Sequence, residues 1–308
     1  MRHAVIDIGT NTVKLLVADV QQGKVIPLAA RDCTTRLGEG VDERRQLSIA
    51  AMDRTIQAIR EFHAEAKALW AADVMALTTS ASRDAANRDE FFDGVRQRCG
   101  LDVKLISGER EAELIFRGVS SDPEWSGQPI LVVDVGGGSA EFIQGAGGKM
   151  EFFQSLPLGA LRLTEKFGEG RFAELSEHLR ATLRHELARY DLHGRRMIGT
   201  GGTITTLAKI CGAADPSSRQ AERLPYNTVM EGGMVDHVKI SRGKLLELVQ
   251  RLETMPLAQR KKVPGLPPER ADIIVAGGAV FLAAMGVLGA NEVTVSIRNL
   301  RYGALLAE

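Results

Sequence analysis

The chain has 308 residues, of which 44% are hydrophobic and 25% charged, and its 39 basic and 39 acidic residues leave a formal net charge of +0. This composition is typical of a soluble globular protein, the length favours two domains, and the neutral balance excludes DNA as an expected partner because nonspecific nucleic-acid binders are usually basic. No apolar run approaches the roughly 20 residues of a membrane span, so no membrane association is expected.

The cysteines and the N-terminus predict a cytoplasmic location. The three cysteines, Cys33, Cys99 and Cys211, are far apart and form no metal-type cluster. Widely separated cysteines are typical of free thiols in a reducing compartment. The first residues enter a strand at once, so no signal peptide is expected. The six histidines are scattered, with no metal-ligand or catalytic-triad spacing.

The first half of the chain predicts three strands followed by alternating helices and strands. Ser48 begins a long helix whose apolar residues follow helical spacing, and Gly100 ends a second helical stretch. Residues 122–127 resemble a linker. The expected strands are 3–9, 12–20, 24–31, 74–79 and 103–106, and the expected helices begin at residues 48, 80 and 107.

From Ile130 the same order begins again, which indicates a fold-level duplication. Such an order predicts mixed α/β sheets with helices on their faces, in two lobes with a ligand cleft between them. The expected strands are 130–144 (a hairpin), 150–156, 197–199 and 293–296, and the expected helices are 174–190, 201–211, 242–252, 269–288 and a short one at the C-terminus. A polar segment covers 215–227.

Two turns carry the clearest chemical pattern. Asp7-Ile8-Gly9-Thr10-Asn11-Thr12 and Asp134-Val135-Gly136-Gly137-Gly138-Ser139 each join two β-branched strands and place an aspartate at the end of the first. Such sequences also make ordinary good turns, which would suffice for one copy. Two copies favour phosphate binding, because glycine lets backbone N–H groups approach an anion and the aspartate can hold a cation beside it.

A third Gly/Thr-rich turn joins a strand to a helix at Gly199-Thr200-Gly201-Gly202-Thr203. The N-terminus of a helix binds anions through its free N–H groups and its dipole. Glycines at this point can equally serve close packing between strand and helix. Sequence reasoning leaves the two interpretations even.

Three glutamates and one arginine have open roles. Glu109, Glu111 and Glu113 lie in the first turns of a predicted helix, where acidic residues complement the helix dipole. Glu113 lies off the apolar stripe of this helix and can pair with Arg117. Periodicity does not decide which of Glu109 and Glu111, if either, faces a cleft as a general base. Arg83 can donate to a phosphate, although a surface ion pair with Asp84 or Asp89 is the simpler interpretation.

The whole pattern resembles the exopolyphosphatase / guanosine pentaphosphate phosphohydrolase (Ppx/GppA) family of the actin-like ATPase superfold, almost from end to end. The segments that carry the resemblance are 6–12, 36–40, 79–83, 106–116, 133–141, 158–160, 163–165, 201–203, 270–274 and 296–303. The resemblance implies an α/β protein with two ribonuclease H-like lobes and a central cleft. It places lobe I at residues 1–124 and 297–308, and lobe II at 125–296.

The resemblance also implies a Mg²⁺-dependent hydrolase, with Mn²⁺ as the alternative ion. Its substrate would be inorganic polyphosphate, guanosine pentaphosphate in the stringent response, or both, and the protein would form a homodimer. Glu111 matches the catalytic glutamate, Asp134 and Glu141 match carboxylates for the metal or the attacking water, and Asp7 matches a metal carboxylate. The implied phosphate-binding residues are Gly9, Thr10, Asn11, Arg83, Gly136, Gly137, Gly138, Ser139, Gly201, Gly202 and Thr203.

In the mechanism that the resemblance implies, Glu111 deprotonates a water for in-line attack on the terminal phosphoryl group, and no covalent nucleophile is expected. Longer family members carry additional C-terminal helical domains, so weak processivity on long polyphosphate is expected here.

Two alternative functions are a small-molecule kinase of the same superfold and an ATP-driven switch protein. Phosphate release without an acceptor separates the hydrolase from the kinase, and nucleotide-dependent polymerisation or partner binding identifies the switch.

Overall fold

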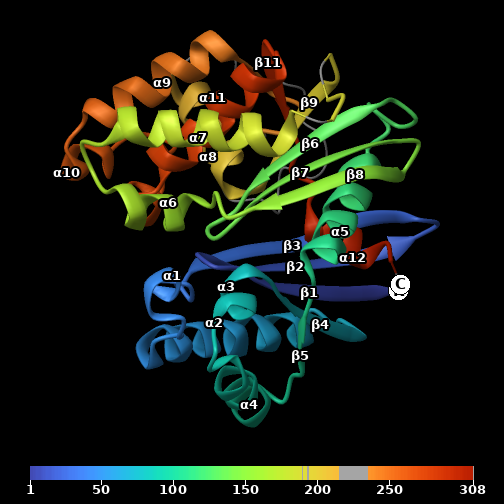
Figure 1. Cartoon of the computed structure of the whole chain (residues 1–308). Helices are drawn as coiled ribbons and strands as arrows, with labels where there is room; N and C mark the ends of the chain where they lie inside the picture. Colours follow the sequence, from blue (N-terminus) through green and yellow to red (C-terminus); the bar gives the residue numbers. More distant parts are fainter. Residues whose placement is uncertain (189, 193, 215–234, 308) are drawn as a thin grey trace. The chain divides into compact units, whose positions relative to one another are not determined.

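The structure of the chain is a computed structural model (Figure 1) and describes residues 1–188, 190–192, 194–214 and 235–307. The described residues divide into two compact units. Unit 1 contains residues 1–121 and 298–307, and unit 2 contains the described residues between 122 and 297. The boundaries of these units differ by a few residues from the lobe boundaries that the family resemblance implies. The predicted polar segment at 215–227 falls outside the described residues.

Unit 1 is built on a five-stranded sheet in the order β3-β2-β1-β4-β5, which is the ribonuclease H-like order. The first three strands are antiparallel, and β4 and β5 continue the sheet in parallel with β1. Asp7 pairs directly with Lys14 across β1 and β2. The strands are β1 (Arg2–Ile8), β2 (Thr12–Gln21), β3 (Lys24–Thr34), β4 (Asp73–Thr78) and β5 (Val103–Leu105).

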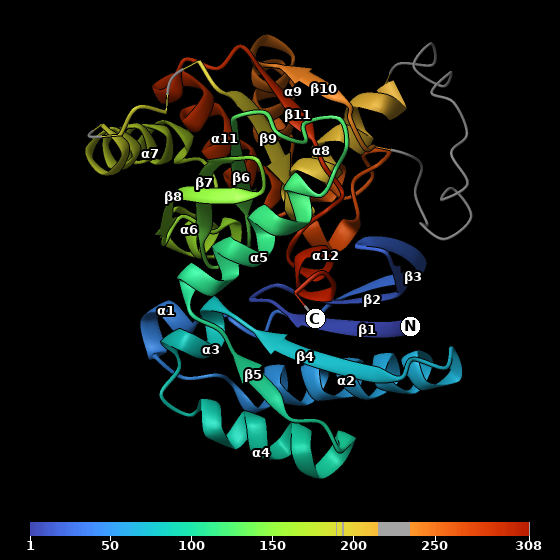
Figure 2. The same ribbon diagram turned by 90° about the vertical axis from the view of Figure 1, so that its right-hand side faces the viewer.

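Helices cover both faces of this sheet. Helices α2 and α4 lie on one face, and α5 and α12 lie on the other (Figure 2). Side-chain caps begin two of them, because the Ser48 hydroxyl accepts from the Ala51 N–H and the Ser107 hydroxyl from the Arg110 N–H. The helices are α1 (Val41–Arg44), α2 (Ile49–Ala68), α3 (Ser80–Asp84), α4 (Arg88–Cys99), α5 (Gly108–Ser120) and α12 (Leu300–Leu305).

Unit 2 repeats this topology, so the predicted duplication is confirmed. Its six-stranded sheet has the order β10-β11-β9-β6-β7-β8, with β6, β7 and β8 antiparallel, β9 and β11 parallel to β6, and β10 added antiparallel at the edge. The strands are β6 (Ile130–Val135), β7 (Ala140–Ala146), β8 (Lys149–Leu156), β9 (Arg196–Thr200), β10 (Lys239–Ser241) and β11 (Glu292–Val295).

The core of unit 2 is centred on α11, which packs against α6, α7, α8 and α9 and is almost entirely buried. No described helix combines the length and the apolar composition that a bilayer crossing requires. The helices are α6 (Ala160–Phe167), α7 (Phe172–Leu187), α8 (Gly201–Ala214), α9 (Arg242–Thr254), α10 (Leu257–Arg260), the 3₁₀ turn η3 (Pro268–Arg270) and α11 (Ile274–Leu288).

The structure corrects two predicted helices and adds α6 together with the short elements α1, α10 and β10, which the sequence analysis does not contain. The helical stretch 80–99 is divided between α3 and α4, because the Asn87 side chain hydrogen-bonds the Leu47 backbone and the Ala86 N–H donates to the Arg45 carbonyl. The helix expected from residue 269 begins only at Ile274, after η3. Helix α6 was not predicted. These differences arise from contacts distant in sequence, which local periodicity does not contain.

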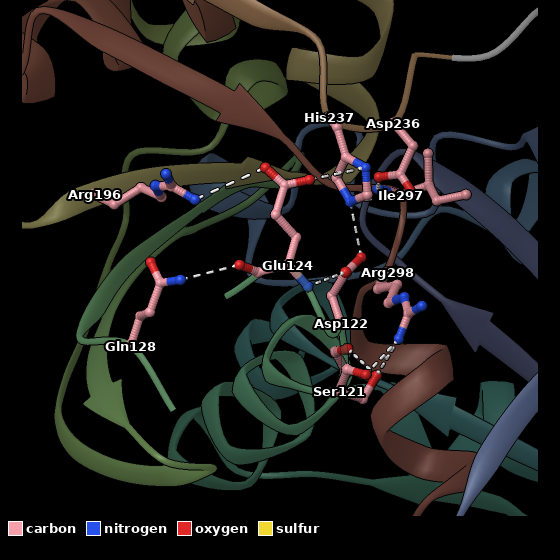
Figure 3. A network of polar contacts seen from close by, with 10 residues as sticks. Ser121, Asp122, Glu124, Gln128, Arg196, Asp236, His237, Ile297 and Arg298 are labelled. Carbon is pink, nitrogen blue, oxygen red and sulfur yellow. Dashed lines mark hydrogen bonds and ion pairs between the residues drawn. The ribbon is translucent and has the colours of Figure 1, made fainter. Parts of the chain in front are cut away.

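The segment predicted as a linker is packed rather than loose. Trp125 is 1% exposed and its ring meets the His237 imidazole edge-on, at 5.0 Å between centroids. His237 Nε2 lies 2.9 Å from an Asp122 carboxylate oxygen, and Nδ1 lies 3.2 Å from Glu124 (Figure 3). An Asp236 carboxylate oxygen accepts from the Ile297 N–H. An acid–imidazole cluster in unit 2 therefore adjoins the Ser121–Asp122 and Ile297–Arg298 bonds, where the chain passes between the units.

Unit 1 also has a hydrogen-bonded contact next to the two points where the chain passes between the units. The Arg298 guanidinium donates to both the carbonyl and the hydroxyl of Ser121, at 2.6 and 2.9 Å. The two crossing segments are thus tied together by Arg298 on the unit 1 side and by the acid–imidazole cluster on the unit 2 side (Figure 3).

The acid–imidazole cluster predicts a pH-dependent stability. Burial by itself lowers the pKa of His237, but the hydrogen bond to Asp122 and the charges of Asp236, Asp122 and Glu124 outweigh it and raise the pKa above 6.5. A raised histidine pKa adds stability that is complete below the unfolded pKa and is lost as pH rises through the folded pKa. The gain is less than about 1 kcal/mol, because the side chain is 35% exposed and solvent screens its ion pairs.

Urea unfolding between about pH 6 and about pH 9 measures this effect. We expect the wild type to lose stability over this range, and the difference between wild type and His237→Gln to shrink as the pH rises. A difference that stays constant with pH would contradict the raised pKa.

Candidate active site

The first glycine-rich turn, residues 9–12, is held by a second backbone segment. The Gly9 N–H donates to the Thr12 carbonyl, which closes the turn between β1 and β2. The Thr10 carbonyl accepts from Gly38, and the Asn11 carbonyl accepts from residues 35 and 36. A Cβ at Gly38 would lie 2.3 Å from the Thr10 side chain, so only glycine permits this approach. The Arg36–Gly40 motif therefore supports the first turn.

The second glycine-rich turn, residues 136–139, repeats the arrangement in unit 2. The Gly136 N–H donates to the Ser139 carbonyl, as Gly9 does to Thr12. The carbonyls of Gly136 and Gly137 accept from the first-turn N–H groups of α6, at residues 160–162. The Arg162 Nε donates to the Gly138 carbonyl at 2.9 Å. Helix α6, which the sequence did not predict, therefore uses the carbonyls of this turn as its N-terminal partners.

These contacts use the carbonyl groups of the two turns and leave several of their backbone N–H groups available. Within the described residues, the backbone N–H groups of Thr10, Asn11, Gly137, Gly138 and Ser139 make no hydrogen bond. Successive N–H groups without partners make an anion-binding concavity. The buried Asn11 Oδ1 also has no partner in the described part of the chain. Each turn therefore presents the donors that a phosphate chain requires.

Glu111 is the buried glutamate of α5. It is 8% exposed, whereas Glu113 forms an exposed ion pair with Arg110 at 2.8 Å instead of pairing with Arg117. Arg83 Nη1 donates to Glu111 Oε2 at 2.8 Å and to the Ile106 carbonyl at 3.1 Å. The simpler sequence-based interpretation, a pair of Arg83 with Asp84 or Asp89, is wrong. A charge-assisted bond of this length fixes the orientation of the Glu111 carboxylate.

Arg83 lies on helix α3, which is linked to the start of the first turn by side-chain hydrogen bonds of Thr78 and Ser82. The Thr78 hydroxyl donates to the Ile8 carbonyl, directly before Gly9, and lies 2.8 Å from the Ser82 hydroxyl. Arg83 follows Ser82 and keeps its Nε and Nη2 donors without a partner among the described residues. Unit 1 therefore brings together the first turn, Glu111 and an arginine with spare donors.

Asp134 and Glu141 form a carboxylate pair in unit 2. They are direct cross-strand partners on β6 and β7, so their side chains lie on the same face of the hairpin. Glu141 is 2% exposed and accepts a hydrogen bond of 2.9 Å from the Ser155 hydroxyl of β8. The sequence analysis did not single out Ser155, because its role depends on the pairing of β7 with β8.

The third Gly/Thr turn lies beside this pair. A Cβ at Gly201, which has φ +86°, would lie 2.0 Å from an Asp134 carboxylate oxygen, so Asp134 sits against the N-terminus of α8. The Thr203 hydroxyl donates to the Val135 carbonyl at 2.9 Å. A Cβ at Gly202 would lie 2.4 Å from Nη1 of Arg270, a buried arginine that sequence reasoning did not assign to the site. Gly201 and Gly202 therefore do serve close packing, and the side chains that they approach are charged.

Asp7 occupies the equivalent position in unit 1. Burial raises the pKa of its carboxyl, and the positive charges of Lys14 and Arg301 lower it without cancelling the effect of burial. An anion that the protein compensates incompletely gains stability from an added cation. Asp7 is therefore suited to lie near a metal ion.

The candidate metal ligands of each unit fit Mg²⁺ in their chemistry. Asp134 and Glu141 in unit 2 offer hard oxygen ligands, as Asp7 does in unit 1, and Mg²⁺ is usually held by one or two carboxylates together with waters and substrate phosphates. Among the described residues, no group of three close histidine, cysteine or carboxylate ligands includes any of them. One or two carboxylates leave coordination positions for waters and a phosphate substrate.

Comparisons with known proteins agree with these features. A family model described as the Ppx/GppA phosphatase family matches residues 16–308. The chain is 34% identical to "Exopolyphosphatase 1" of Mycobacterium tuberculosis, over 99% of this chain and 88% of that protein. It is 30% identical to "Exopolyphosphatase 2" of the same organism, over 99% of this chain and 98% of that protein.

Two solved structures extend the similarity to the fold. An exopolyphosphatase from Cytophaga hutchinsonii has a TM-score of 0.87 and 26% identity, and the match covers 99% of this chain and 96% of that one. An Aquifex aeolicus member of the Ppx/GppA family has a TM-score of 0.78 and 30% identity, with 100% and 97% covered. The similarity therefore includes both units.

The support of the second turn by α6 gives a stability prediction. A Cβ at Gly159 would lie 2.3 Å from backbone atoms of Gly137 and Gly138, although its φ of −73° suits any residue. We expect Gly159→Ala to cost about 1–3 kcal/mol in the free energy of unfolding, because overpacking against backbone cannot relax through a side chain. Chemical denaturation measures the change.

Gly243→Ala is the matched control. An added Cβ there meets nothing within 4 Å, and the residue lies in the first turn of α9. We expect no loss, or a gain of up to about 1 kcal/mol from helix propensity. Equal effects of the two substitutions would contradict the tight packing of Gly159 against the turn.

Proposed function

Because this chain belongs to the Ppx/GppA phosphatase family, which makes it a phosphoanhydride hydrolase, we propose that it releases terminal orthophosphate from inorganic polyphosphate. Relatives named exopolyphosphatase align with 99% of the chain and support this substrate. Guanosine pentaphosphate carries the same phosphoanhydride linkage at its 5′ end and is the second candidate substrate.

The observation that carries the proposal is the set of unpaired N–H groups in the two glycine-rich turns. Polyphosphate is a chain of anionic units without other functional groups, so a site for it needs donors and positive charge rather than an apolar pocket. The turn at 9–12 supplies such donors in unit 1, and the turn at 136–139 supplies them in unit 2. Arg83 adds a charged donor beside the first.

We assign the general base to Glu111. As water attacks the terminal phosphorus, a Glu111 oxygen takes its proton, the phosphoanhydride bond breaks, and the shortened chain leaves with its bridging oxygen. The short bond from Arg83 keeps the carboxylate in one orientation, which is how positioning accelerates phosphoryl transfer. Asp134 and Glu141 in unit 2, and Asp7 in unit 1, are the carboxylates suited to hold Mg²⁺, which when bound would neutralise charge on the phosphate oxygens.

A small-molecule kinase and an ATP-driven switch remain the alternatives. A kinase needs an acceptor, so orthophosphate release from polyphosphate in its absence separates the two activities. A switch protein would change its assembly with nucleotide. A cytoplasmic location, a homodimeric state and a role in the stringent response are further predictions of the family resemblance.

Glu111→Gln should abolish catalysis without affecting the fold. We expect phosphate release from polyphosphate to fall by about 10²- to 10⁴-fold, because an amide cannot accept the proton from water. Release is measured with Mg²⁺ and no acceptor, on short and long polyphosphate, guanosine pentaphosphate and ATP.

Glu113→Gln is the control on the same helix, since this residue pairs with Arg110 on the exposed surface. We expect wild-type release. If Glu111→Gln retains activity, the assigned base is wrong, and if the wild type releases nothing from any of the four substrates, the hydrolase proposal fails.

Removal of either unit 2 carboxylate should weaken the metal site. We expect Asp134→Asn and Glu141→Gln to raise the Mg²⁺ concentration for half-maximal activity by more than about tenfold, because each amide loses a charged oxygen ligand. Glu151→Gln is the control, since Glu151 lies on β8 and, in the part of the chain that the structure describes, hydrogen-bonds only the Gln144 amide. An unchanged Mg²⁺ requirement in both site variants would contradict the ligand assignment.

A further inference from the structure

The C-terminal helix α12 is integrated into unit 1 far more tightly than its six residues suggest. All of its residues are buried, and it packs against both α5 and β1 (Figure 2). A Cβ at Gly303 would lie 1.7 Å from the Leu114 carbonyl oxygen, and a Cβ at Gly118 would lie 2.2 Å from the Asn299 carbonyl oxygen. The backbones of α5 and α12 therefore touch directly, beginning at Leu114, one turn after Glu111.

Arg301 extends from this helix to the sheet. It is 8% exposed, and its Nη1 donates to the Leu15 carbonyl of β2 at 2.8 Å. The Asn299 side-chain oxygen accepts from the Arg301 backbone N–H at 3.0 Å and from its Nε at 3.4 Å. Hydrogen bonds through Nη1 and Nε thus fix the orientation of the guanidinium. Burial lowers the pKa of this group.

The charges that face Arg301 belong to the first half of the sheet. Leu15 follows Lys14, which pairs directly with Asp7 on β1 and with Asp32 on β3. The electrostatic attraction of Arg301 is to Asp7, Tyr302 and Asp32. A buried guanidinium is costly unless anions compensate it, and the attraction to Asp7 and Asp32 offsets part of that cost.

We propose that Arg301 is a positioning residue that connects Asp7 and the first glycine-rich turn to the helix of Glu111. Arg301 holds β2 next to Asp7, while Gly303 holds α12 against α5, so one short helix sets the separation between the two carboxylates. The inference deepens the proposed function and rests on it for its catalytic meaning. Its structural content, the coupling of the β1–β2 turn to α12, is independent of the substrate.

A purely structural role would affect stability alone, so the test compares three substitutions for catalysis. Arg301→Met keeps the apolar stem and removes the charge and the bond to Leu15. Arg301→Lys keeps the charge but loses the planar hydrogen-bonding geometry. Arg117→Met is the matched control, because Arg117 Nη1 bonds the Leu306 carbonyl across the same α5–α12 contact without reaching the sheet.

We expect Arg301→Met to lower kcat for polyphosphate by about ten- to a hundredfold, with KM changed by less than about threefold, since displaced catalytic groups act mainly on the transition state. Arg301→Lys should recover part of the loss, and Arg117→Met should match the wild type. All proteins are assayed well below their melting temperatures.

Amide hydrogen exchange of the metal-free proteins gives a readout that does not depend on activity. Arg301→Met should speed exchange at residues 8–14 more than in α2 or α4, and Arg117→Met should not. Uniformly faster exchange, or a kcat equal to wild type in Arg301→Met, would overturn the positioning role. If the wild type itself releases no phosphate while the local exchange effect is present, the proposed function fails and the coupling stands.

Discussion

Backbone hydrogen bonding within the two glycine-rich turns is the constraint on which the candidate site depends. A tight turn exposes N–H and C=O groups that a folded protein must pair with other groups or with water. In both turns the carbonyls are taken by a second segment of the same unit, residues 35–38 in one and the N-terminus of α6 in the other. The N–H groups of Thr10, Asn11, Gly137, Gly138 and Ser139 have no partner among the described residues, so both turns present backbone donors for an anion.

Each carboxylate near these turns has its own means of compensation. Glu111 pairs with Arg83, Glu141 accepts from a serine hydroxyl, and Asp134 lies at a helix N-terminus. The charges of Lys14 and Arg301 balance Asp7 only in part, and its pKa is still raised. The Glu111 carboxylate is thus fixed by an ion pair, whereas the charge of Asp7 is compensated incompletely. This difference corresponds to their proposed roles, because a metal ligand must have affinity left for a cation and a base must have a fixed direction.

The two units share the topology and the glycine-rich turns of a duplicated fold, but they differ in the charged side chains near those turns. Both have three antiparallel strands followed by parallel ones, and both close the first hairpin with the same N–H to carbonyl bond. Unit 1 then adds α3 and α5, which bring Arg83 to Glu111. Unit 2 adds α8 against Asp134 and the 3₁₀ turn that ends with Arg270. In the proposed mechanism the shared hairpins bind phosphate, α3 and α5 supply the base in unit 1, and in unit 2 α8 packs against Asp134 of the carboxylate pair on the shared hairpin.

The amino-acid sequence by itself determined the strand triplets, the caps of α2 and α5 and the two glycine-rich turns. These features depend on residues close together in the chain, so β-branched runs, serine caps and glycine clusters were enough to predict them. Their duplication indicated phosphate chemistry, and the family resemblance selected Glu111 where periodicity left Glu109 and Glu111 open.

Tertiary structure decided which side chains meet. The pairing of Arg83 with Glu111, the contact of Ser155 with Glu141 and the reach of Arg301 to β2 join residues 28, 14 and 286 positions apart. No local pattern contains such contacts, because they arise only when strands pair and helices pack. The sequence therefore determined the strand triplets, the glycine-rich turns and the chemical class of this protein, and the packing of the elements decided the partner of each charged group.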